Sequence, residues 1–171
     1  MATLTVWHYP TPLGAKVGAV RVRALQGLEA LEVLDAVTIT WIPGAHQPRL
    51  SQGHHLLASR TPDRSVLAAL VRALAVDRAP GDRDAAVSAV AQRLAGTGID
   101  EPLLGEVVEH LSPGASMLMV LSGWMDLDVV RPAVERGLAR EGVTLLYAEL
   151  PSDAMVVLRS VLVDEVPEQD H

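Results

Sequence analysis

The sequence predicts a mixed α/β (α+β) domain, and three observations support this class. Segments in which apolar and polar residues alternate occur near both ends of the chain, and such alternation is typical of strands. Segments with apolar residues three and four positions apart follow these strands, and this spacing is typical of helices. The chain has 171 residues, of which 49% are hydrophobic, so it can bury one substantial core.

The first part of the chain predicts a strand, a helix and a second strand. Residues 3–9 alternate and form the first strand, and residues 33–42 alternate again and form the second. Thr11 is the expected N-cap of the helix between them. The expected buried stripe of this helix consists of Leu13, Val17, Val20, Ala24, Leu28 and Leu31. Gly14 and Gly18 lie near the stripe and would let the helix approach a sheet closely.

The rest of the chain predicts mainly helices and two further strands. Residues 46–60 are polar and show no period, so we expect a loop there. Three helices are expected next, over residues 62–76, 84–95 and 100–111, with Asp100 as the cap of the third. Residues 116–121 are apolar throughout, which is typical of a central strand covered on both faces. We then expect a helix from Asp126 or Asp128, a strand over 143–150 and a final helix capped by Ser152.

Two strand–helix–strand units joined by a connection predict a ferredoxin-like sandwich. We expect one domain over residues 1–163, with a helical insertion at about residues 60–112 between the second and third strands. The four strands should form one antiparallel sheet with the helices mainly on one face. Residues 164–171 are acidic and are expected to form a disordered tail.

Composition narrows the possible functions. The chain has no cysteine, which excludes disulfides, thiolate metal sites and thiol catalysis. Its net charge of −7 argues against nucleic acid and an anionic membrane surface as partners, because both require a basic surface. No signal segment is visible, and the apolar runs are far shorter than the roughly twenty residues that span a bilayer. We expect a cytoplasmic protein without membrane insertion, and its arginine-rich, lysine-poor composition is typical of actinobacteria.

Several short segments resemble a known bacterial family. They are residues 2–7, Thr11-Pro12, residues 35–37 with Trp41, Gly98-Ile99-Asp100 and Pro113-Gly114. Together they are similar to the family known as domain of unknown function 1269, whose members are described as membrane proteins. Those members carry a glycine-rich apolar segment in the middle, where this chain has the charged residues 60–95. The resemblance therefore implies a soluble variant, and it supplies no catalytic residues.

The histidines are the first candidates for chemistry. His46, His54 and His55 fall in one loop and His8 ends the first strand, so three imidazoles could hold zinc or copper. No carboxylate or cysteine lies at a familiar ligand spacing, and adjacent histidines usually point in different directions. Solvated loop histidines are therefore expected, and we predict neither a metal site nor a cofactor.

The remaining candidates surround the sheet face that we expect to be uncovered. Trp7 and Trp41, together with His54 and His55, are the candidate ligand-binding residues. The candidate catalytic residues are His8, Tyr9 and Asp35. Asp35 would be a general base if a pocket buried it, and a strand-start or turn residue otherwise.

Two functional hypotheses remain open. In the first, the protein is a non-catalytic binding or self-assembling module. It forms a homodimer or larger homo-oligomer, because one apolar face of residues 116–121 must meet the inserted helices, a second subunit or a ligand. In the second, it is an enzyme, such as a cyclase or isomerase, acting on a small apolar molecule in bacterial secondary metabolism.

Glu106, Glu109 and His110 are expected to face water, and no nucleophile or phosphate-loop motif is present.

Overall fold

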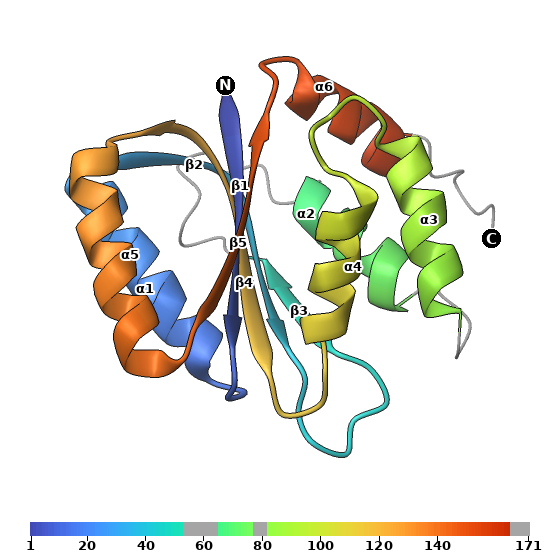
Figure 1. Cartoon of the computed structure of the whole chain (residues 1–171), viewed down its shortest axis with the longest axis horizontal. Helices are drawn as coiled ribbons and strands as arrows, with labels where there is room; N and C mark the ends of the chain where they lie inside the picture. Colours follow the sequence, from blue (N-terminus) through green and yellow to red (C-terminus); the bar gives the residue numbers. More distant parts are fainter. Residues whose placement is uncertain (53–64, 77–81, 165–171) are drawn as a thin grey trace.

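A five-stranded antiparallel sheet forms the centre of the protein, as the computed structural model shows (Figure 1). The structure describes residues 1–52, 65–76 and 82–164. The strands are β1 (Ala2–Tyr9), β2 (Leu31–Thr40), β3 (Arg49–Gln52), β4 (Ser116–Met125) and β5 (Thr144–Leu150). Their order in the sheet is β3-β2-β4-β1-β5, so the first and last long strands of the chain are neighbours.

The four long strands were predicted, whereas β3 was not. The prediction of a loop over residues 46–60 is wrong for Arg49–Gln52, which pairs with residues 37–40 of β2. A short edge strand is held by backbone hydrogen bonds, and four residues are too few to show a reliable side-chain period. The expectation for His54 and His55 falls outside the described residues.

Six α-helices and two π-helical segments surround the sheet in the described part of the chain. They are α1 (Gly14–Gly27), α2 (Val66–Val71), η1 (Arg72–Val76), α3 (Arg83–Arg93), α4 (Glu101–His110), α5 (Leu127–Glu141), α6 (Ala154–Arg159) and η2 (Ser160–Asp164). None of these described helices is long and apolar enough to cross a membrane.

The predicted helix caps are right for α4 and α5 and wrong for α1 and α6. Asp100 accepts a hydrogen bond from the Leu103 amide, and Asp126 accepts one from the Asp128 amide. At α1 the chain makes a turn after Thr11, so Leu13 takes the N-cap position without a side-chain hydrogen bond. At α6 the N-cap position belongs to Asp153 rather than Ser152.

Helices cover both faces of the sheet, which corrects the prediction that they lie mainly on one face. Helices α1 and α5 lie on one side in Figure 1, and α2, α3, α4 and α6 lie on the other. The inserted helices therefore cover the second apolar face of β4. Its residues Met117, Met119 and Leu121 pack against them, while Leu118 and Val120 face α1 and α5. The expected uncovered face, and a pocket there, do not exist in the described part.

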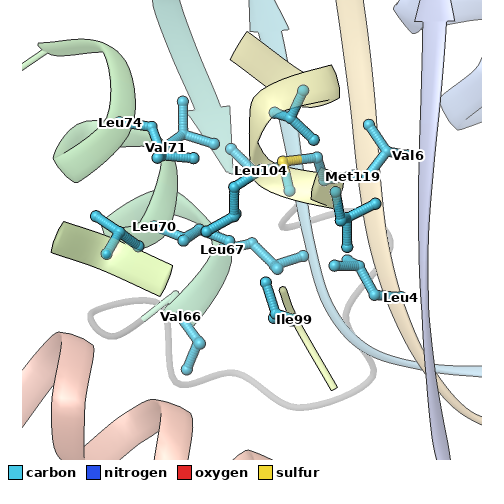
Figure 2. Packing of buried hydrophobic residues seen from close by; sticks show 14 of the residues in the cluster. Leu4, Val6, Val66, Leu67, Leu70, Val71, Leu74, Ile99, Leu104 and Met119 are labelled. Carbon is cyan, nitrogen blue, oxygen red and sulfur yellow. The ribbon is translucent and has the colours of Figure 1, made fainter. Parts of the chain in front are cut away.

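The larger core cluster lies between the sheet and the inserted helices. Figure 2 shows how its aliphatic side chains converge from β1, β4, α2, η1 and α4. The labelled members are Leu4, Val6, Val66, Leu67, Leu70, Val71, Leu74, Ile99, Leu104 and Met119. Because η1 continues α2 without a break, Leu74 still reaches this core.

The smaller core cluster lies beneath α1, and it buries a different face of that helix from the one predicted. The buried residues are Ala15, Gly18, Ala19, Val22 and Leu25, whereas Leu13, Val17, Val20 and Leu28 are exposed. The sheet presents the large side chains of Trp7 and Tyr9 on this side. Small residues of α1 must face them, so the larger aliphatic stripe turns outward.

Candidate functional site

Asp35, one of the candidate catalytic residues, anchors the start of helix α2. Its side chain is only 5% exposed and lies on the face of β2 that meets the inserted helices. The Leu67 amide donates to one carboxylate oxygen at 2.9 Å, and the Ser65 hydroxyl lies 3.0 Å from both oxygens. Ser65 in turn accepts from the Ala68 amide at 3.1 Å. The carboxylate and the hydroxyl therefore satisfy amides that would otherwise lack acceptors at the helix N-terminus.

Burial affects the pKa of Asp35 more than its hydrogen bonds do. Removal from water raises the pKa of this carboxyl group, while the bonds from Leu67, Ser65 and Ala36 lower it, and burial is the larger effect. A raised pKa at a polar cleft would favour a general base. Here the two oxygens are engaged by backbone and hydroxyl donors, so the geometry is that of a structural anchor.

His8 is half-buried at the end of β1 and lies against His110 at the end of α4. The two ring centroids are 4.7 Å apart and the planes are inclined by 58°. The Nδ1 atom of His110 donates to the Glu106 carbonyl oxygen at 2.7 Å. Burial, and then the neighbouring His110, lower the pKa of His8. His8 is therefore neutral at neutral pH. The prediction that His110 faces water is only partly right, because its ring contacts that of His8.

The aromatic candidates serve packing. Trp7 is buried beneath α1 and α5, and its indole N–H donates to the Thr5 hydroxyl at 3.2 Å. Tyr9 is 1% exposed and its ring lies along α1 where Gly14 and Gly18 leave room. Trp41 packs on the rim of the larger core and donates to the Ala45 carbonyl oxygen at 3.0 Å.

The predicted site residues are not brought together in the described part of the chain. His8 and Tyr9 are adjacent in β1 and therefore point to opposite faces of the sheet. Asp35 lies on β2, which is separated from β1 by β4. Among the described residues no group of three or more histidines, aspartates or glutamates is placed to hold a metal ion.

The edge strand β5 is a further candidate site, although the sequence predicted it only as a strand. β5 pairs with β1 along one edge and ends the sheet, and no described strand pairs with its other edge. In Figure 1 β5 runs in front of the other strands, between the two helical layers. An edge without a partner strand presents backbone donors and acceptors for pairing. Gly98 packs against the Glu149 carbonyl oxygen near the end of the strand.

The side chains of β5 do little to protect this edge. The strand reads Thr-Leu-Leu-Tyr-Ala-Glu-Leu and carries one charge, that of Glu149. Tyr147 is 58% exposed at its centre and donates to the Glu149 carboxylate at 2.9 Å. This bond is the main cause that raises the pKa of Tyr147. Lysine, proline and bulges, the usual means of blocking edge pairing, do not occur in this strand.

Comparison with known protein families, curated proteins and solved structures finds no match to this chain.

Proposed function

We propose that the protein is a non-catalytic module with a ferredoxin-like fold that forms a homodimer through the outer edge of β5. The observation that carries the proposal is this nearly uncharged strand, whose other edge pairs with no described strand. The fold assignment is supported by the units β1-α1-β2 and β4-α5-β5, whose strands interleave in the order β2-β4-β1-β5. The family resemblance and a cytoplasmic location stay predictions.

The chemistry of an edge favours a strand as the partner. Backbone groups spaced along β5 are satisfied together when another extended segment is added to the sheet. A second copy of β5 meets this need about a two-fold axis, because an antiparallel pair of identical strands is self-complementary. Tyr147 lies at the middle of the strand, so the two copies of this ring would lie close to the axis.

Hydrogen exchange at two protein concentrations tests this proposal. We expect amides of residues 144–150 to exchange more slowly at high concentration, because the outer amides become hydrogen-bonded only in the dimer. Amides of α1 serve as the internal control and should be unaffected. Equal exchange of residues 144–150 at all concentrations, with a monomer mass by light scattering, would refute the proposal.

A further inference from the structure

Helix α1 turns an apolar stripe toward solvent. Four apolar side chains follow one another at helical spacing on the side of the helix opposite the core. They are Leu13, Val17, Val20 and Leu28, which are 63%, 46%, 68% and 70% exposed. The helix contains no acidic residue, and its charged residues are Lys16, Arg21 and Arg23. A contiguous row of exposed apolar side chains is typical of a binding surface.

A groove lies beside this stripe, between α1 and α5, which run next to each other in Figure 1. Its volume is about 300 Å³. The apolar part of its lining comes mainly from Leu25 and Leu28 of α1. The charged part comes from Arg21 of α1 and from Arg136 and Arg140, which are one turn apart on α5. None of the described side chains that line the groove is acidic.

Gly137 of α5 leaves room for the guanidinium group of Arg21. A Cβ atom at this position would collide with Nη1 of Arg21, so the glycine admits the Arg21 guanidinium between the helices. Arg136 and Arg140 are exposed and form no ion pair with any side chain that the structure describes. Two arginines one turn apart repel each other, so an anion bound between Arg136 and Arg140 would relieve that repulsion.

The net charge of the layer formed by α1 and α5 differs in sign from that of the whole protein. Helices α1 and α5 together contain six basic and three acidic residues, whereas the chain has a net charge of −7. The overall charge, on which the expectation about anionic partners was based, therefore hides a local basic surface.

An apolar hollow lies at the other end of the same side of α1. It has a volume of about 330 Å³ and is lined by Tyr9, Pro10, Thr11, Leu13, Gly14 and Val17. Val17 of this hollow and Ala24 of the groove are seven residues apart, which corresponds to about 10 Å along the helix. The hollow lies beyond the end of the groove at which Arg140 stands, because Gly142, which follows α5, lies beside Pro10 of the hollow. The apolar end of the groove is the opposite end, at Leu28.

We propose that this groove binds a free anionic amphiphile, with a carboxylate head on Arg136 and Arg140 and an apolar body along Ala24 and Leu28. Planar guanidinium groups match the geometry of a carboxylate and bind it in bidentate fashion. The recessed position between two helices fits a small molecule better than the flat surface of a bilayer. This site is separate from the β5 edge and does not depend on self-association.

Binding of dansylaminoundecanoic acid, followed by its fluorescence, tests the site. We expect the wild-type protein to bind this probe with a blue-shifted emission, and the variant Arg136→Gln/Arg140→Gln to bind it at least about tenfold more weakly. Arg131→Gln is the matched control, because Arg131 is an exposed arginine of the same helix that does not line the groove. Its affinity should equal that of the wild type.

The methyl ester of the probe separates charge recognition from apolar adsorption. The ester should bind the wild-type protein at least about tenfold more weakly than the acid, and it should bind the double variant no more weakly than the wild type. Equal affinity for acid and ester, or an unchanged affinity in the double variant, would overturn the proposal. So would binding to sedimented phosphatidylglycerol vesicles without binding of the free probe, which would assign the surface to a membrane.

Discussion

The contact between Tyr9 and α1 predicts opposite effects for the same substitution at two glycines of one helix. A Cβ atom at Gly18 would lie 2.8 Å from Cζ of Tyr9 and closer still to its hydroxyl oxygen. The ring is 1% exposed and has no room to move, so Gly18→Ala overpacks the core at a cost of about 1–3 kcal/mol. The better helix propensity of alanine offsets up to about 1 kcal/mol of this cost. With the full offset, we expect a net loss of up to about 2 kcal/mol in the free energy of unfolding.

Gly27→Ala is the matched control, because nothing lies within 4 Å of a Cβ atom at Gly27. This variant should be more stable than the wild type by up to about 1 kcal/mol, since only the backbone effect remains. Urea denaturation followed by circular dichroism measures both changes. Removing the hydroxyl with Tyr9→Phe should reduce the cost of Gly18→Ala. A Gly18→Ala variant as stable as the Gly27→Ala variant would refute the proposed contact.

Three further predictions concern the buried polar groups. Asp35→Ala should lower the free energy of unfolding by about 2–4 kcal/mol, measured by urea denaturation, because the Leu67 amide and the Ser65 hydroxyl lose their acceptor. Burial raises the pKa of Asp35 in the folded state above its ordinary value of 3.8. Between the ordinary pKa and the raised pKa, the folded state therefore binds more protons than the unfolded state. The Asp35 contribution to stability should therefore fall as pH rises through this window, and a contribution that rises there would be contradictory. NMR titration should give His8 a pKa below 6.5 that rises in His110→Gln; an unchanged value would exclude His110 as a cause.

The alternation and the capping residues made much of the fold predictable. Residues 3–9 alternate because β1 lies between two helical layers, and its two sets of side chains meet different cores. Asp100 and Asp126 end extended segments and accept from amides two or three residues later, which is a local interaction. Gly142 adopts a φ of 63°, which is typical of a glycine that ends a helix.

The choice of buried face in α1 was not predictable from periodicity. The helix is apolar on two sides, one formed by small residues and one by Leu13, Val17, Val20 and Leu28. Which side is buried depends on the size of Tyr9 in the sheet below it, and that is a tertiary contact. Hydrophobic patterning favours the larger residues and therefore selected the wrong side.

The candidate site was less predictable than the fold, because its features are formed by partners that are distant in the sequence. Asp35 receives its hydrogen bonds from residues about thirty positions later. His8 meets His110 only because α4 is placed over the end of β1. The open edge of β5 follows from strand order, and a strand that ends a sheet has no distinct pattern of its own.

Sedimentation equilibrium of the variant Tyr147→Lys tests the proposed self-association most directly. Pairing of two β5 edges would bring the two introduced lysines close to each other and to the two-fold axis, where like charges are destabilising. Val156→Lys is the control, because Val156 is 73% exposed and belongs to α6 rather than to β5. We predict twice the chain mass of 18.2 kDa for the wild type and for Val156→Lys, and the mass of a single chain for Tyr147→Lys. A monomeric wild type, or a Tyr147→Lys variant that stays dimeric, would contradict the account.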